Sequence, residues 1–452
     1  MIRLTRLATL SIALSVLFPI SARAAAPADT LADGTRVERW TLANGMKVVT
    51  RSAPGSRAVA ITLGYRMGID DDPAGRSGLA QLLGELAFTA AAGIQPERVP
   101  GELDSQRPLG WSYPVLRHMT LLTEVASLDR FPQVLAQVAE RAKGVTVDAA
   151  QLGVARARVK KELAQQLFGE PTLVLNHQLR EIARGRSDGE IVRHASGSEI
   201  ERVTLDEAQQ ELRRWHCPAN AVLSLVGDFG AVDVHALVER QFGSIPGGAA
   251  RPEPAMAPLR PVMRAMRRDG APIGTIGILA PALSDSSHPS FYMAAMVFGS
   301  LCQETWNQGA AQGASRFQFA LVDEPELFRL FPDVPKTEGD PGRLVSTLRL
   351  ATDILPTLTI PDDEFDQMRS SMTVVLGGPM PRAQRTALAT NPGLLHSLAR
   401  SQAACELRMD PGFWERYRRS LETVHPGSVS HWKDWFEAPA HQVVLLLTPN
   451  PK

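Results

Sequence analysis

The chain has 452 residues, which is room for two domains, and its 48 basic side chains balance 48 acidic ones. Residues 1–24 hold three arginines and no acid, so the remainder carries a net charge of about −3 (45 − 48). Because the remainder has no positive surplus to neutralise phosphates, no nucleic-acid partner is expected.

Residues 1–24 have the pattern of a signal peptide. Arg3 and Arg6 give a positive start, residues 7–20 form an apolar run, and an A-x-A cleavage signal ends at Ala24. The apolar run is shorter than the ~20 residues of a spanning helix, so no stable membrane anchor is expected after cleavage. The pattern predicts export, and we interpret the destination as a bacterial periplasm.

Residues 40–51, WTLANGMKVVTR, alternate apolar and polar side chains around Asn44 and Gly45. This alternation predicts two antiparallel strands that are joined by a tight hairpin. Asn-Gly is a common pair in two-residue type I′ turns, so we predict a turn of that type here.

Residues 68–88, GIDDDPAGRSGLAQLLGELAF, predict a helix. This segment resembles the opening helix of the M16 (insulinase/pitrilysin) zinc peptidases, in which a G-x-A lead-in runs into H-x-x-E-H and an apolar tail ending in Phe. In that motif the two histidines bind zinc and the glutamate acts as general base. Here residues 78–80 and 86–88 match the lead-in and the tail, but residues 81–85 read QLLGE.

The resemblance implies a degenerate site with motif positions Gln81, Gly84 and Glu85. Gln81 offers only a neutral amide, and Gly84 has no side chain to take a proton and costs the helix ~1 kcal/mol relative to Ala. The third family ligand corresponds to Glu162, 77 residues after Glu85 (162 − 85), and it is the only ligand position retained. We therefore expect no metal, although the active members use zinc, and interpret the two carboxylates as solvated or paired with arginine.

Residues 108–125 correspond to the family strand that pairs with extended substrate. Trp111, Ser112 and Tyr113 occupy the Asn-Ala zone of that strand and are candidates for binding unstructured peptides. Pro114 removes a backbone donor, so at least one ladder bond to a peptide would be lost. Two interpretations remain open: a reshaped peptide groove with an aromatic floor, or a strand packed against its own domain.

Residues 212–246 give the most specific match, a strand with the family's V-x-G-D ending, a helix, and F-G-x-I-P. They close a first domain predicted at 36–246, which corresponds to the zinc-site domain. A linker rich in Pro, Ala and Gly is predicted at 247–261, and a second domain at 262–452. The second domain is expected to contain a strand near 271–281, several helices and a terminal strand.

The second half also departs from the family. Active members carry an arginine and a tyrosine, seven residues apart, that bind the substrate; the resemblance puts Trp306 and Gly313 at these positions. Neither residue type can donate a charge-assisted bond. The three cysteines, Cys217, Cys302 and Cys405, show no CxxC spacing, and whether a disulfide forms is left open.

Together these features predict an α+β fold with two related domains, each a mainly antiparallel sheet covered by helices, facing each other across a groove. We interpret the chain as a non-catalytic M16 homologue that is a peptide-binding or structural partner of an active, zinc-bearing M16 paralogue. The two chains are expected to form a heterodimer. Two alternatives remain: an active metalloendopeptidase with a rebuilt site, and a stand-alone periplasmic scaffold or chaperone-like binder.

Overall fold

The computed structural model describes residues 28–89, 99–251, 258–267, 272–307, 314–333 and 341–448. The predicted signal peptide at 1–24 lies outside the described residues, and so do residues 252–257 of the predicted linker. Within the described ranges, no helix is both long and apolar enough to cross a membrane.

The first half of the chain forms a seven-stranded sheet in the order β1-β2-β3-β7-β4-β6-β5. Its strands are β1 (Ala28–Thr30), β2 (Arg36–Thr41), β3 (Lys47–Ser52), β4 (Ala58–Tyr65), β5 (Trp111–Ser112), β6 (Thr120–Ser127) and β7 (Ala221–Gly227). All neighbours pair antiparallel except β3 and β7. The central strands β4 and β7 are buried along their whole length.

The second half forms a five-stranded sheet in the order β10-β11-β9-β12-β8. Its strands are β8 (Val262–Arg267), β9 (Ile273–Leu279), β10 (Ala314–Gln318), β11 (Leu327–Asp333) and β12 (Gln442–Thr448). Only β12 and β8 run parallel. The strands expected near 271–281 and at the C-terminal end are present as β9 and β12.

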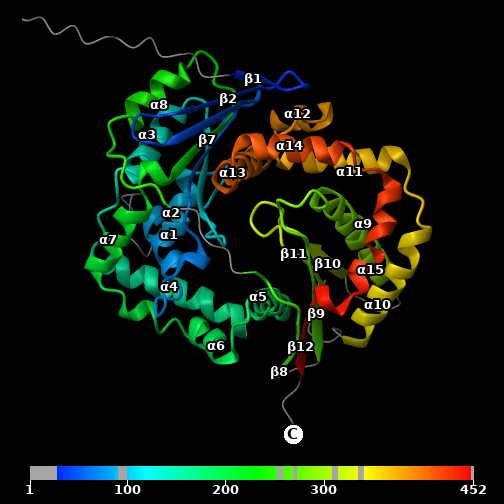
Figure 1. Cartoon of the computed structure of the whole chain (residues 1–452). Helices are drawn as coiled ribbons and strands as arrows, with labels where there is room; N and C mark the ends of the chain where they lie inside the picture. The colour runs from blue at the N-terminus through cyan, green and yellow to red at the C-terminus, as the bar shows by residue number, and fades with distance from the viewer. Residues whose placement is uncertain are drawn as a thin grey trace, which may run out of the picture.

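Fifteen helices of the described chain surround these sheets (Figure 1). Those of the first half are α1 (Leu79–Thr89), α2 (Val99–Gln106), α3 (Phe131–Ala142), α4 (Ala149–Phe168), α5 (Pro171–Ala183), α6 (Asp188–Ser196), α7 (Leu205–Trp215) and α8 (Val234–Phe242). Those of the second half are α9 (His288–Asn307), α10 (Pro341–Ile354), α11 (Asp362–Val375), α12 (Arg382–Leu388), α13 (Pro392–Arg408), α14 (Pro411–Glu422) and α15 (Lys433–Glu437). The predicted fold class, α+β with two mainly antiparallel sheets, is confirmed.

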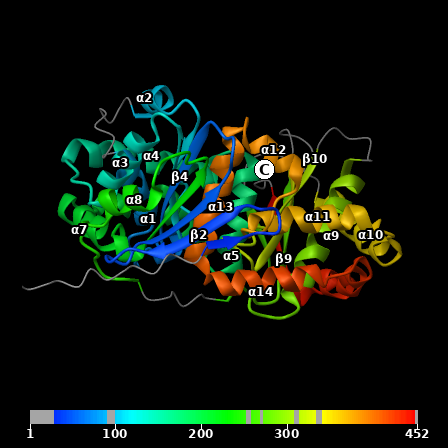
Figure 2. The ribbon, with the colours of Figure 1, turned by 90° about the horizontal axis from the view of Figure 1, so that it is seen from above.

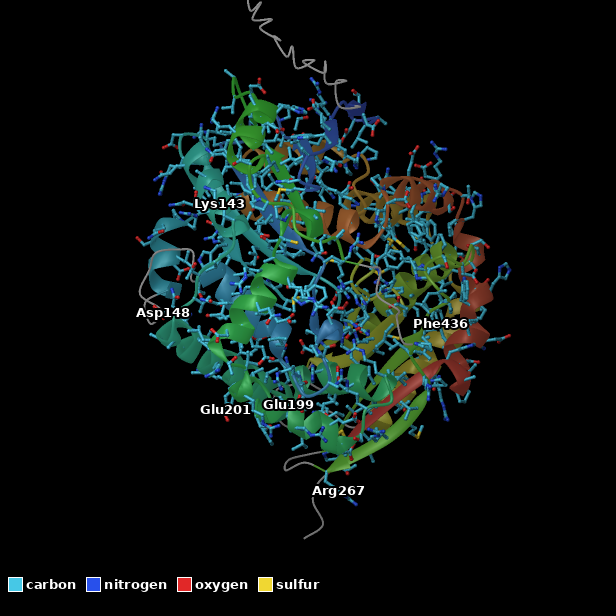
Figure 3. All side chains as sticks on the ribbon, turned by 60° about the vertical axis from the view of Figure 1, so that its left-hand side comes forward. Lys143, Asp148, Glu199, Glu201, Arg267 and Phe436 are labelled. Carbon is cyan, nitrogen blue, oxygen red and sulfur yellow. The ribbon has the colours of Figure 1, made fainter. Side chains whose placement is uncertain are left out.

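Each half has its own hydrophobic core. Helices α1, α3, α4, α7 and α8 contribute to a core on one face of the first sheet. Phe436 belongs to the second core, where its ring stacks on Phe298 with the centroids 4.4 Å apart. It lies across the molecule from Lys143 and Asp148 (Figure 3).

The Asp148 carboxylate caps the start of α4. It accepts a hydrogen bond from the backbone amide of Gln151 at 2.8 Å.

Two helices cross over between the halves. Helix α13 of the second half lies on β4, β6 and β7 of the first sheet, where Leu395 and Ala399 pack against Ala60 and Val226. Helix α5 of the first half lies on β9, β11 and β12 of the second sheet. Figures 1 and 2 show both helices in the middle of the molecule. Each sheet is thus covered on a second face by a helix of the other half, so the division into two separate domains stays a prediction.

The predicted hairpin is present, but its turn is of another type. Strands β2 and β3 are joined by residues 42–46, and the Leu42 amide donates to the Met46 carbonyl at 2.9 Å. Gly45 has φ +89°, whereas no other residue type in the described chain has positive φ. A type I′ turn needs positive φ at both central residues, so the prediction was wrong. Asn44 instead donates to the carbonyls of Phe242 and Ile245, at 2.8 and 3.0 Å, and ties the hairpin to the end of α8.

A buried ionic cluster joins the two halves. Its centre is Glu324, a fully buried residue between β10 and β11, and we call the group of Glu324 with Arg117, Arg180, Arg184 and Arg329 the Glu324 cluster. Arg117 and Arg180, both from the first half, approach the carboxylate to 2.7 and 3.0 Å. Burial opposes ionisation, but the arginine charges outweigh it and hold the pKa of Glu324 at about 2.

Candidate functional site

Helix α1 lies in the core of the first half, and all eleven of its residues are buried. The Asp72 carboxylate accepts hydrogen bonds from the backbone amides of Gly78 and Ala80, at 2.6 and 2.7 Å, and so supplies acceptors at the start of the helix. Burial raises the pKa of Asp72 to about 7, against the effect of these two bonds. Asp72 is not among the site residues predicted from the sequence.

One face of α1 borders a cavity of about 290 Å³, which we call the α1–α4 cavity. Its lining consists of Gln81, Glu85, Tyr113, Pro114, Val115, Arg158, Val159 and Glu162. The structure therefore brings Gln81, Glu85 and Glu162 together, as the resemblance implied. Tyr113 joins them, whereas Trp111 and Ser112 of the same predicted peptide-binding group lie outside the lining.

An arginine neutralises the buried carboxylate of the cavity. Arg158 Nη1 donates to Glu85 Oε1 at 2.7 Å, and the Glu85 side chain is only 5% exposed. Glu85 is thus an arginine-paired carboxylate, which is the interpretation that its chemistry favoured. Arg158 itself was not predicted from the sequence, although it lies four residues before Glu162 and so on the same face of α4.

Two other polar groups of the cavity, Tyr113 and Glu162, have raised pKa values. Burial, the charge of Glu85 and a hydrogen bond to Glu85 raise the pKa of the Tyr113 hydroxyl, which therefore stays protonated. Glu162 is exposed at the solvent side of α4. The protein around its carboxylate and the negative charge of Glu85 raise the pKa of Glu162. Within the described chain, Glu162 has no ion-pair partner.

Gln81 is the unusual residue of the cavity. It is 4% exposed, yet neither Nε2 nor Oε1 of its amide has a hydrogen-bond partner among the described residues. A buried polar group without a partner costs ~1–3 kcal/mol. Such a group calls for an explanation, and a bound ligand or water that completes its hydrogen bonds is one.

The residues of the α1–α4 cavity do not fit a zinc ion. Zinc prefers imidazole and thiolate ligands, and this lining contains neither. Of its two carboxylates, Glu85 is already paired with Arg158. Across the described residues, no three His, Cys, Asp or Glu side chains are grouped to hold a metal. We therefore derive no hydrolytic step through a metal.

Gly84 is required by packing. A Cβ at this position would meet Val115 Cγ2 at 2.5 Å and Thr120 Cγ2 at 3.4 Å. The helix propensity that Ala would add at this position is therefore opposed by a steric clash with the segment that follows β5. A general base at position 84 would need the same space.

Strand β5 is the end strand of the first sheet and pairs with β6 alone, Trp111 opposite Glu124 and Ser112 opposite Thr123. Trp111 and Tyr113 stack on each other and on Phe88 of α1, with centroids 4.7 to 5.8 Å apart. Ser112 Oγ lies 2.9 Å from His396 Nε2 of α13. The aromatic residues are thus packed on their own domain, while the strand keeps one edge without a strand neighbour in the described chain.

The predicted loss of the Arg/Tyr pair stays a prediction. Trp306 belongs to α9, and nothing is described of its side chain. Gly313 lies outside the described residues. The thiols of Cys217, Cys302 and Cys405 are buried, and none of the three is in a disulfide.

Two kinds of comparison relate the chain to known proteins. Residues 202–351 match the family model described as the peptidase M16 inactive domain. No curated protein sequence matches the chain.

Among solved structures, a protease from Helicobacter pylori is similar with a TM-score of 0.72 and 16% identity, over 92% of this chain and 100% of that one. The M16 inactive domain from Pseudomonas fluorescens is similar with a TM-score of 0.66 and 16% identity, over 92% and 98%. The periplasmic protease PqqL from Escherichia coli is similar with a TM-score of 0.65 and 16% identity; the match covers 94% of this chain and 48% of PqqL.

Proposed function

Because the chain belongs to the M16 peptidase family, we propose that it is a non-catalytic member that acts in the periplasm as a peptide-binding partner of an active, zinc-bearing M16 paralogue. In this proposal the paralogue supplies the chemistry. This chain supplies binding surface and shape.

The observation that carries the proposal is the ion pair of Arg158 and Glu85 in the α1–α4 cavity. A catalytic zinc site needs three protein ligands, an open position for water and a base beside it. Here a guanidinium holds one carboxylate, Gln81 is a neutral amide, and Gly84 leaves no space for a base. The match to the inactive M16 domain covers residues 202–351 and none of the cavity lining, so the cavity is an independent argument.

Two further observations support a partner in the periplasm. PqqL is a periplasmic protease, and the match to this chain covers 48% of its length. In PqqL, a unit with this fold is therefore part of a chain about twice as long. The edge of β5 that has no strand neighbour among the described residues offers backbone groups that an extended peptide can pair with.

The proposal is tested on the mature protein with two measurements. Purified protein is expected to contain far less than one zinc per chain and to cleave no unstructured peptide above background. Affinity purification from the native envelope at physiological salt is expected to recover an M16 protein with an intact H-x-x-E-H motif. One zinc per chain with chelator-sensitive cleavage would overturn the non-catalytic role, and recovery of the chain alone would overturn the partner role.

A further inference from the structure

The α1–α4 cavity combines an unsatisfied amide, an unpaired carboxylate and a protonated hydroxyl. Gln81 contributes one donor and one acceptor that are buried without partners among the described residues. Glu162 contributes a carboxylate without an ion-pair partner in the described chain, and Tyr113 contributes its phenol. Polar groups that can bind an occupant thus line the cavity from α1, from α4 and from the segment after β5.

The charges of the lining select the sign of the occupant. When all groups are ionised, two carboxylates and one guanidinium leave a net charge of −1 in the cavity. A monovalent cation neutralises this charge, whereas a divalent metal would put two positive charges beside Arg158, which already lies 2.7 Å from Glu85. An anion would face Glu162 directly.

The shape and donor geometry select the kind of cation. The volume of about 290 Å³ is at the small end of ligand pockets, which start near ~300 Å³, so it suits one side chain or chain end. An ammonium group presents three donors that diverge from one point, which suits acceptors at Glu162, Gln81 and Tyr113. A planar guanidinium would have to lie beside that of Arg158.

We propose that the α1–α4 cavity binds the primary ammonium group of an extended peptide, from a lysine side chain or a free N-terminus. The ammonium donates to Glu162 and to Gln81 Oε1, and a neighbouring peptide carbonyl accepts from Gln81 Nε2. Residues 113–115 line the cavity directly after β5, so a peptide added at that edge would point alternate side chains toward it. This inference deepens the peptide-binding part of the proposed function and rests on it.

The first experiment varies the peptide and measures Kd by calorimetry with the mature protein. An N-acetylated, C-amidated peptide with one lysine is compared with the same peptide carrying norleucine or arginine in its place, and with a norleucine peptide that has a free N-terminus. We expect the lysine or the free-amine peptide to bind at least about tenfold tighter than the acetylated norleucine peptide. Which of the two gains affinity identifies the source of the ammonium.

The second experiment varies the protein. Glu162→Gln keeps the size of the side chain and is expected to abolish the preference for the charged peptide. Gln81→Met removes the unsatisfied amide, so it is expected to raise the melting temperature and yet weaken binding of the charged peptide. A purely structural defect at Gln81 would raise the melting temperature and leave Kd unchanged. Glu140→Gln, on the exposed face of α3, is the matched control and should change neither.

The outcomes separate this inference from the proposed function. If lysine, arginine, free-amine and norleucine peptides bind equally, or if Glu162→Gln has no effect on their ranking, the ammonium site is overturned while peptide binding stands. If no peptide binds, both are overturned, and the partner role is judged by co-purification. Stoichiometric binding of zinc or magnesium that depends on Glu162 and displaces the lysine peptide would replace the ammonium by a metal.

Discussion

The α1–α4 cavity and the Glu324 cluster are both built from carboxylates and arginines, but they differ in how completely the charges are compensated. Four arginines surround Glu324, which is fully buried. In the cavity, Glu85 has one arginine, Glu162 has no ion-pair partner within the described chain, and Gln81 is unsatisfied there. The difference lies in charge compensation rather than in hydrogen bonding, because Glu324 Oε2 and side-chain nitrogens of Arg184 and Arg329 also lack a hydrogen-bond partner among the described residues. The Glu324 cluster fixes the halves to each other, whereas the cavity keeps a carboxylate without an ion-pair partner in the described chain.

The largest effect on stability is expected at the Glu324 cluster. Glu324→Gln leaves buried arginines without their common anion and should lower the free energy of unfolding by about 3–5 kcal/mol, measured by urea denaturation at pH 7. Glu140→Gln, which removes an exposed partner of Lys143, should give no measurable change. A loss at Glu324 as small as that of the control would mean that the cluster does not hold the halves together.

The pH dependence of the same variant has a definite sign. The folded-state pKa of Glu324 is about 2, below its usual value of 4.5. A depressed pKa contributes stability that is present above the unfolded-state pKa and is lost as pH falls toward the folded-state pKa. The difference between native protein and Glu324→Gln should therefore be constant above about pH 5 and shrink between pH 4.5 and 2.

A smaller effect is expected for the ion pair in the cavity. Arg158→Met leaves the buried Glu85 carboxylate without its guanidinium and should cost about 2–3 kcal/mol, less than at Glu324 because the Arg158 side chain is partly exposed. Adding Glu85→Gln should restore part of the loss, since the charge that needed compensation is then absent. The double-mutant cycle measures this coupling; strictly additive losses would contradict the ion pair.

Gly84 tests whether packing or helix propensity dominates on α1. Gly84→Ala should destabilise the protein by about 1–2 kcal/mol because the added Cβ meets Val115. Gly153→Ala, within α4, has nothing within 4 Å of its Cβ and should stabilise by up to ~1 kcal/mol. Thermal unfolding of both variants checks the opposite signs, and stabilisation by both would show that α1 is not tightly packed there.

The smallest effect on stability is expected at Glu162 of the α1–α4 cavity. Removing a carboxylate at Glu162 should raise stability slightly, by less than ~0.5 kcal/mol at pH 7, because desolvation by the surrounding protein and, to a smaller extent, repulsion from Glu85 raise the pKa of Glu162. A raised pKa gives stability that is present at low pH and lost as pH rises, so the gain in Glu162→Gln should vanish below pH 4. A destabilised variant at pH 7 would mean that Glu162 has a compensating partner.

The sequence predicted the secondary-structure elements better than it predicted the contacts between them. Alternation around Gly45 located the hairpin, and the resemblance to the family brought Glu162 to Glu85 across 77 residues (162 − 85). Arg158 was missed because a single sequence gives no distance between side chains on two helices. The turn type was wrong because Asn44 is held by the carbonyls at the end of α8, a contact nearly 200 residues away in the chain.

The crossing of α5 and α13 could not be predicted from the pattern of their residues. The apolar positions of a helix show that one face is buried, but they do not show which sheet covers it. The complete fold assigns Leu395 and Ala399 to the first sheet, where they pack with Ala60 and Val226.

The position of α13 has a consequence for the order in which the protein folds. The last strand of the first sheet ends at Gly227, whereas α13 starts at Pro392, 165 residues later (392 − 227). At usual rates of synthesis this interval corresponds to roughly 8–33 s. Until α13 is available, the face formed by Ala60, Val125 and Val226 has no cover of its own, and closing so long a loop is slow. A first half that is made before α13 would therefore expose this apolar face, and we expect its tendency to aggregate to fall only when α13 is complete, at residue 408.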